Sequence, residues 1–242
     1  QQKGYHTNTI AKHMKHLTRH INIAINKENI EIQKYAFMKY KIKIVENKHT
    51  HLVPEELEQL ERLSLTGKYM KLQKSLDAFL FCCYAGMRYS DFTNLSKKNI
   101  VDINQETWLI YKSVKTGTEV RLPLYLLFAG KGIVILNKYR NNLEVFFRLR
   151  DNSNINKDLI IIAKLAGLSK KISFHTARHT NATLLIYNGV NITTVQKLLG
   201  HKSVKTTQVY TNIMDMTIVH DLEKMKQATL GIKKKTDNSF NN

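Results

Sequence analysis

Apolar positions along the chain recur mostly at the three- and four-residue spacing of amphipathic helices. The first such segment spans residues 8–26, NTIAKHMKHLTRHINIAIN, with a basic opposite face. Its apolar stripe consists of Ile10, Met14, Leu17, Ile21 and Ile25. Asn8 or Thr9 is expected to cap this helix. Because one helix cannot bury such a stripe alone, we expect it to complete a bundle whose earlier helices lie outside this chain.

A change of pattern near residue 50 predicts a domain boundary. Residues 40–53 lose the helical periodicity and indicate an extended basic linker. Pro54 then opens a new helix with acidic residues in its first turn, where the helix dipole favours them. We therefore expect a helical part with a linker over residues 1–50, a main domain over 51–230, and a disordered basic and polar tail over 231–242.

The main domain is predicted to be mainly α-helical with a small antiparallel β-hairpin, an α+β fold. Helices are expected at residues 72–87, 155–168, 175–189, 191–200 and 214–229. Residues 107–124, TWLIYKSVKTGTEVRLPL, alternate β-branched and aromatic residues on both sides of a Lys-Thr-Gly-Thr turn, which predicts the hairpin. Gly189 and Gly200 are expected to end their helices.

The charge of the chain points to a polyanionic partner. Its 242 residues include 38 Lys and Arg against 19 Asp and Glu, which gives a formal net charge of +19. Neutralising a phosphate releases a condensed counterion, so an excess of this size favours nucleic acid.

Other features favour a cytoplasmic protein. The sequence has no apolar run near the roughly 20 residues of a membrane span, and it opens without a signal peptide. Cys82 and Cys83 are adjacent in an apolar segment, so we expect reduced, buried thiols. The missing initiator Met suggests that an N-terminal portion is absent.

Several residues could carry phosphate chemistry. His175 and Arg178 share one face of a predicted helix, where an Arg fork suits a phosphate and an imidazole can move a proton. Taken alone, the pair also fits a solvated helix face. Arg88 ends an apolar helix, where a cation needs an anionic partner, although an ion pair with Asp91 would also explain it. Lys115 lies at the hairpin turn, where exposed lysines are common.

A metal site is not predicted. His175 and His179 have the i, i+4 spacing of a helical metal pair, but Thr176 stands where a zincin would have Glu. No cluster of acidic, His or Cys residues at ligand spacing follows.

The order of these segments is informative. AGMRYSD, VKTGTEVRLPL, HTARHT and LLGHKSVKTTQVYT follow one another as in the tyrosine recombinases, the phage-integrase family, which the chain resembles over residues 51–230. The sequence is most similar to integrases of bacterial mobile elements. The resemblance implies the catalytic-domain fold of these DNA breaking and rejoining enzymes. It also implies that residues 1–50 are the end of a DNA-clamping core-binding domain, with Lys12, Lys15 and Arg19 facing DNA.

The same resemblance implies a role for each matched residue. Arg88 and Arg178 would clamp the phosphate, His201 would add a donor, and Lys115, or the nearby Lys112, would protonate the leaving 5′ oxygen. Tyr210 would be the nucleophile that forms a 3′-phosphotyrosyl link, and His175 is the natural acceptor of its proton. No metal, ATP or other cofactor is implied.

The implied activity is site-specific recombination or integration on double-stranded DNA. The family works as a tetramer on two DNA sites, so we expect a homotetramer on DNA, a monomer without it, and a docking helix at residues 214–229 that packs in cis or in trans. Two alternatives are DNA relaxation of the type IB topoisomerase kind and a non-catalytic helix-turn-helix regulator built from residues 190–210. The regulator would leave Arg88, Lys115, His175 and Arg178 without a role.

Overall fold

The computed structural model describes residues 4–27, 41–45 and 49–210, together with Leu222 and Lys226. The chain divides into two compact units, residues 1–48 and 49–242. Within the described ranges, no helix is long and apolar enough to cross a membrane. Apart from Leu222 and Lys226, the helix predicted at 214–229 lies outside the described residues, as does the tail predicted at 231–242.

The first unit contains helix α1 (Thr7–Asn26), which confirms the helix predicted at 8–26. The predicted cap is wrong: His6 is the N-cap residue, and its side chain makes no capping hydrogen bond. The Asn8 amide instead pairs with the backbone of Val45. Its Nδ2 donates to the Val45 carbonyl at 2.7 Å, and its Oδ1 accepts from the Val45 N–H at 2.9 Å.

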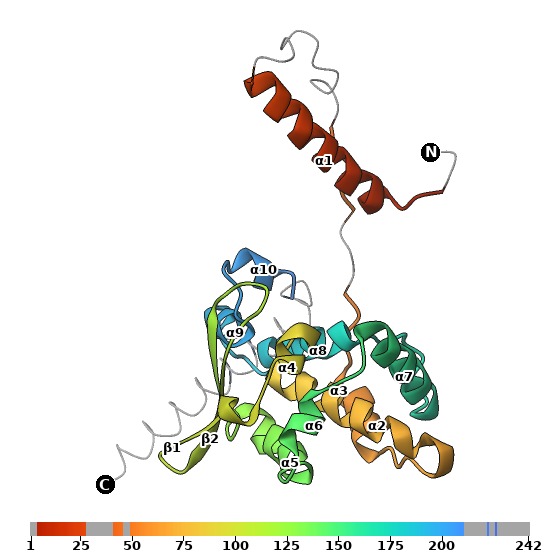
Figure 1. The fold of residues 1–242 in the computed structure, drawn as a ribbon, viewed down its shortest axis with the longest axis vertical. Coiled ribbons are helices and arrows are strands. Elements are labelled where there is room, and N and C mark those ends of the chain that lie inside the picture. Colours follow the sequence, from red (N-terminus) through yellow and green to blue (C-terminus); the bar gives the residue numbers. More distant parts are fainter. Residues whose placement is uncertain (1–3, 28–40, 46–48, 211–221, 223–225, 227–242) are drawn as a thin grey trace. The chain divides into compact units, whose positions relative to one another are not determined.

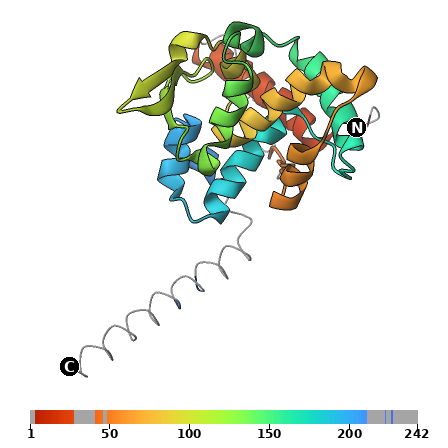
Figure 2. The same cartoon turned by 90° about the horizontal axis from the view of Figure 1, so that it is seen from below.

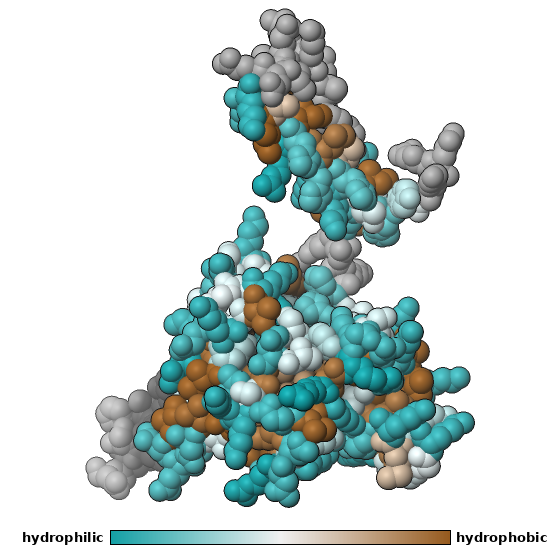
Figure 3. All heavy atoms as spheres, in the orientation of Figure 1, coloured by the Kyte–Doolittle hydropathy of each residue, from teal (hydrophilic) through white to brown (hydrophobic). Residues whose placement is uncertain are grey.

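The apolar stripe of α1 is only partly covered within its own unit. Leu17 is 46% exposed, and the other stripe residues are partly exposed, namely Ile10, Met14, Ile21 and Ile25. Apolar side chains (brown) are open to view beside hydrophilic ones (teal) along this helix in Figure 3. The half-exposed stripe fits the expectation that α1 is one helix of a larger bundle.

The second unit is a helical body with a small antiparallel sheet at one edge (Figures 1 and 2). Its α-helices are α2 (Pro54–Arg62), α3 (Gln73–Ala85), α4 (Tyr89–Thr93), α5 (Lys131–Lys138), α6 (Leu143–Phe147), α7 (Asn152–Leu165), α8 (Phe174–Tyr187), α9 (Ile192–Leu199) and α10 (Lys205–Gln208). Short 3₁₀ helices are η2 (Gly67–Leu72), η3 (Lys97–Asn99) and η4 (Leu127–Gly130). The sheet runs in the order β1 (Ile100–Ile103), β2 (Glu106–Lys112), β3 (Glu119–Pro123).

Helices α3 and α8 form the centre of this unit and pack against each other. The sequence LDAFLFCCYA is apolar except for Asp77, which pairs with Lys138 at 2.9 Å. Residues 75–85 of α3 are all buried, as expected for a core helix. Cys82 and Cys83 are buried free thiols, as predicted, and burial raises the pKa of both. The predicted helices at 72–87, 155–168, 175–189 and 191–200 are confirmed as α3, α7, α8 and α9.

A glycine ends α3 and fixes where the following residues go. Gly86 has φ +66°, a left-handed conformation that side chains disfavour. A Cβ on Gly86 would lie 2.6 Å from Asn181 Oδ1 on α8. The same Asn181 amide donates to the carbonyls of Cys83 and Tyr84 at 2.9 and 3.0 Å, so α8 satisfies the last carbonyls of α3. This close approach places Arg88 beside the polar end of α8.

The predicted hairpin is confirmed as β2 and β3, with Lys112 opposite Glu119 in the register. Its turn is closed by the Ser113 N–H, which donates to the Thr118 carbonyl at 2.8 Å. The sequence did not predict β1, which pairs with β2 through a turn at Asn104 and Gln105, both with positive φ.

Candidate active site

Arg88 lies between α3 and α4, at the N-cap position of α4. Its Nη1 donates to Ser113 Oγ at 3.0 Å and lies 3.4 Å from Asp91 Oδ2. The Arg88 side chain is 13% exposed, whereas that of Asp91 is fully covered. The ion pair considered from the sequence therefore exists, and it holds a cation at the edge of the core with part of its surface open.

Asp91 also anchors the hairpin turn. Its Oδ1 accepts the Val114 N–H at 2.8 Å, and its carboxylate lies 3.3 Å from Ser113 Oγ. On the other side of the turn, Thr116 Oγ1 donates to the Gly200 carbonyl at 3.2 Å. The turn that carries Lys115 is thereby tied both to α4 and to the end of α9.

Lys115 is exposed at this turn, and its charge contributes to lowering the pKa of both His175 and His201. Lys112 is also exposed, but it lies at the end of β2, opposite Glu119. Of the two lysines, Lys115 is thus the one whose charge acts on the histidines of the site.

Arg178 on α8 is only 1% exposed. Its Nη1 donates to the Gly86 carbonyl at 2.7 Å, and its Nη2 donates to the Leu199 carbonyl at 2.6 Å. Burial, and next the nearby Arg88, lower the pKa of Arg178 to about 10, so it stays charged at neutral pH. Because a guanidinium has five N–H donors, this side chain can join the ends of α3 and α9 and still offer donors to a phosphate.

Tyr210 follows α10 and is 5% exposed. Its hydroxyl lies 3.0 Å from Nδ1 of His179, which is 8% exposed on α8. Burial raises the pKa of Tyr210, whereas Arg178 and Arg88 act in the opposite direction. The predicted nucleophile is therefore held inward, toward the arginines, by a histidine of α8.

His201 lies just after Gly200, which ends α9 with φ +62° as predicted. It is 8% exposed, and its Nδ1 lies 2.9 Å from Oγ1 of Thr207 on α10. Burial lowers the pKa of His201 to about 3, and Arg178 and Arg88 act in the same direction. His201 thus connects the end of α9 to the short helix that leads to Tyr210.

His175 lies in the first turn of α8 and is exposed, with its ring edge-on to His179 at 4.5 Å between centroids. Partial desolvation, and then Arg178 and Arg88, lower its pKa.

The structure brings the six predicted catalytic residues into one electrostatically coupled cluster. Arg88 and Arg178 act on Tyr210, His175 and His201, and Lys115 acts on both histidines. Lys12, Lys15 and Arg19 are exposed on α1 in the other unit.

Sequence reasoning missed the residues that hold this cluster together. They are Ser113, His179 and Thr207, the anchoring role of Asp91, and His49, whose ring stacks on that of His179 at 4.4 Å between centroids. His179 had a visible signal, because it lies one turn beyond His175 on the same helix face. The others depend on contacts between distant segments. Within the described residues, no group of three or more His, Cys, Asp or Glu side chains is arranged to hold a metal ion.

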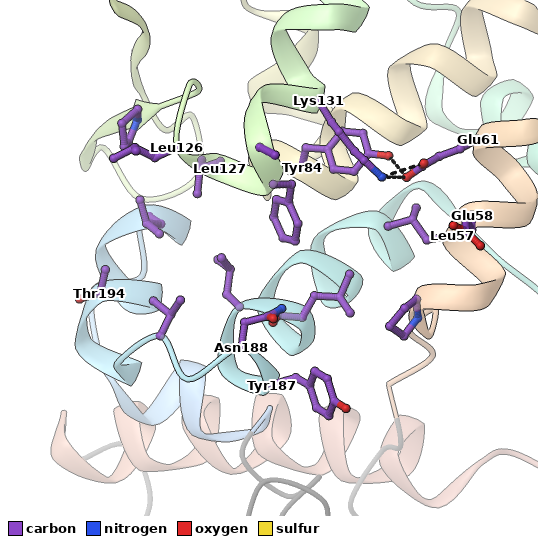
Figure 4. A pocket seen from close by; sticks show the side chains of 18 of the residues that line it. Leu57, Glu58, Glu61, Tyr84, Leu126, Leu127, Lys131, Tyr187, Asn188 and Thr194 are labelled. Atoms are coloured by element: carbon purple, nitrogen blue, oxygen red, sulfur yellow. Dashed lines mark hydrogen bonds and ion pairs between the residues drawn. The ribbon is translucent and has the colours of Figure 1, made fainter. Parts of the chain in front are cut away.

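A second feature of this unit is an apolar groove of about 1020 Å³ between α2, η4, α8 and α9 (Figure 4). Leu57, Leu127, Leu184 and Leu198 are among its lining residues. Glu61 accepts hydrogen bonds from the Tyr84 hydroxyl and from Lys131, the latter at 2.8 Å. None of the six predicted catalytic residues lines this groove.

Comparison with known proteins places this fold and site in a family. The model of the phage integrase family matches residues 51–216, and the chain belongs to that family. Tyrosine recombinase XerC of Rickettsia prowazekii is 28% identical over 192 residues, which cover 75% of this chain and 60% of that protein. The chain therefore spans about three fifths of the length of this curated relative.

Solved structures share the fold. The Tn1549 transposon integrase in complex with circular intermediate DNA has a TM-score of 0.66 and 18% identity, over 86% of this chain and 76% of that one. A lambda integrase tetramer bound to a Holliday junction has a TM-score of 0.63 and 19% identity, over 80% of this chain and 56% of that one. The predicted tyrosine-recombinase catalytic-domain fold is thereby confirmed.

Proposed function

We propose that the chain is the catalytic part of a site-specific DNA recombinase or integrase that cuts and rejoins DNA through Tyr210. The observation that carries this proposal is the placement of the buried Tyr210 hydroxyl, which lies 3.0 Å from Nδ1 of His179, the neighbour of the buried Arg178 on α8. The partner is double-stranded DNA, consistent with the net charge of +19. We also propose a cytoplasmic location.

The chemistry assigns a separate task to each group. A phosphodiester under attack gains charge on its non-bridging oxygens, which Arg88 and Arg178 stabilise from two sides. His201 donates to the same oxygens, and His175, the acceptor of the Tyr210 proton that the sequence suggests, lies exposed at the start of α8. Lys115 protonates the leaving 5′ oxygen. The phosphotyrosyl link stores the energy of the broken bond, so rejoining to another 5′-hydroxyl needs no ATP.

The assembly is part of the same proposal. We infer that Lys12, Lys15 and Arg19 of α1 contact the DNA backbone and that four copies act on two sites. The exposed basic face of α1 supports the first inference. The lambda integrase tetramer on a Holliday junction, a protein of the same fold, supports the second.

A nicked suicide duplex built from the DNA that flanks the gene tests this function. After cleavage, the short fragment downstream of the cut diffuses away, so the covalent complex cannot rejoin. We expect a denaturant-resistant protein–DNA band with the wild type and none with Tyr210→Phe. A wild type that binds the duplex without forming the band would contradict the proposed activity. A band with Tyr210→Phe would exclude Tyr210 as the nucleophile.

A further inference from the structure

We propose that His179, rather than His175, accepts the proton of Tyr210 during strand cleavage. This inference rests on the proposed function and names a further catalytic residue for it.

The first support is the direct contact between His179 and Tyr210. His179 Nδ1 lies 3.0 Å from the Tyr210 hydroxyl, within the range over which a proton is transferred directly. The His175 ring meets the edge of the His179 ring, and among the described residues the hydrogen bond of the Tyr210 hydroxyl is to His179. His179 is therefore the imidazole already in place for this step.

The second support is that the His179 ring is fixed from two sides. His49 stacks on it at 4.4 Å between centroids and 19° between planes, and His175 packs edge-on at 4.5 Å. The segment that carries His49 is tied to α8, because the Leu52 N–H donates to Thr180 Oγ1 at 2.9 Å. A ring held in this way keeps Nδ1 aimed at the phenol, which a proton acceptor requires.

The third support is the division of exposure between the two histidines. His175 is open to solvent at the start of α8, whereas His179, one turn further along the helix, is 8% exposed. The outer imidazole suits a donor to phosphate oxygen, and the inner one suits the nucleophile.

The Tyr210 oxygen bonds to phosphorus while its O–H bond breaks, and the proton goes to Nδ1 of a neutral His179, giving an imidazolium. The P–O5′ bond breaks, and the 5′ oxygen takes a proton from Lys115. In rejoining, the 5′-hydroxyl gives its proton to the neutral Lys115 amine as its oxygen bonds to phosphorus. The P–O bond to Tyr210 breaks, and the imidazolium returns its proton to the phenol oxygen.

Burial, assisted by the groups around it, keeps His179 neutral before DNA binds. Burial lowers the pKa of His179 to about 3. Smaller effects in the same direction come from His175, His49, Arg178 and His51. A bound phosphodiester brings negative charge that offsets Arg178, so the imidazolium becomes less costly when the proton arrives. Transfer occurs as the oxygen bonds to phosphorus, because that bond makes the phenol proton strongly acidic.

The test compares His179→Asn with the matched variant His175→Asn in single-turnover cleavage of the suicide duplex. Asparagine places a hydrogen-bonding atom near Nδ1 but takes no proton. We expect His179→Asn to slow cleavage by about 10²-fold or more. Its rate should also keep rising with pH, because hydroxide must replace the base, whereas the wild-type rate levels off. Wild-type rate and pH profile in His179→Asn would overturn the proposal.

A substrate with sulfur at the bridging 5′ position separates the two proton transfers, because a thiolate leaves without a general acid. It should restore cleavage by Lys115→Ala but not by His179→Asn. Restoration of both variants would place His179 on the leaving-group side and overturn the proposal. If the wild type cleaves neither substrate, the proposed function itself fails.

A measurement that needs no change at His179 covers the case in which that variant does not fold. In histidine-labelled protein, Tyr210→Phe should shift the ¹⁵N resonance of His179 Nδ1 toward that of a nitrogen without a hydrogen bond. An unchanged resonance would remove the contact on which the inference depends.

Discussion

The two halves of helix α8 serve different regions of the molecule. The first half buries Arg178 and His179, and each has a partner: backbone carbonyls for the arginine and Tyr210 for the histidine. The second half contributes Leu184 and Leu185 to the apolar groove. Buried polar groups are costly unless they are paired, so Arg178 and His179 are fixed by directional contacts, whereas Leu184 and Leu185 at the groove are held by packing. A substitution in the first half should therefore impair catalysis, and one at the groove should not.

The largest effect is expected at Arg178. Arg178→Lys keeps the charge but cannot bridge the carbonyls of Gly86 and Leu199 and still face a phosphate. We expect cleavage of the suicide duplex to fall about 10²–10³-fold while DNA binding is retained. The melting temperature should also fall, because the freed carbonyls are buried. Arg121→Lys, at an arginine that is 54% exposed on β3, is the control and should change neither the cleavage rate nor the melting temperature. Equal losses of binding and cleavage would mean that Arg178 only docks DNA.

The next effect concerns the close approach of α3 and α8. Gly86→Ala adds a Cβ at 2.6 Å from Asn181 Oδ1 in a backbone with φ +66°. Gly67→Ala is the matched control, because Gly67 has φ +55° but nothing within 4 Å of the added Cβ. We expect Gly67→Ala to lower the unfolding free energy by about 1 kcal/mol and Gly86→Ala by about 3 kcal/mol. Urea denaturation measures both, and equal losses would show that the contact with α8 is unimportant.

A smaller effect is expected from pH. The pKa values of His179 and His201 are lowered to about 3 in the folded chain from an ordinary 6.5. Between these values the unfolded state binds more protons, so stability is full above about pH 6.5 and is lost as pH falls toward 3. Calorimetry should show a melting temperature that drops from pH 7 to pH 4. The double variant His179→Asn/His201→Asn should lose part of that slope, and an unchanged slope would assign it to other groups.

The smallest effect is expected at the groove. Tyr84→Phe removes one hydrogen bond to Glu61, which keeps its contact with Lys131 at 2.8 Å. We expect the unfolding free energy to fall by about 1.5 kcal/mol, the low end for a hydrogen bond to a charged group, and cleavage to stay at the wild-type rate. A large loss of cleavage would show that the groove and the candidate active site are coupled through α8.

Much of the second unit could be predicted because its local signals agree. The apolar run of α3, the hairpin around Lys-Thr-Gly-Thr and Gly200 after α9 each specify an element without help from distant residues. Strand β1 could not be predicted, because it is defined by its pairing with β2. The cap at Asn8 was predicted wrongly for a similar reason, since Val45 takes its side chain.

The same limit applies to the site. Residue type and order indicated Arg88, Arg178 and Tyr210 as candidates, but not which histidine faces the tyrosine. His175 and His179 share a helix face, and only the path of the chain after α10 brings Tyr210 to His179. Assigning the proton acceptor therefore required the tertiary structure.

The most direct test of the account is to locate the bond between protein and DNA. The covalent complex from the suicide duplex is digested with trypsin and nuclease, and the modified peptide is sequenced by mass spectrometry. The account predicts a nucleotide attached through phosphate to the peptide 206–224, in which Tyr210 is the only tyrosine. A nucleotide on any other peptide would contradict it.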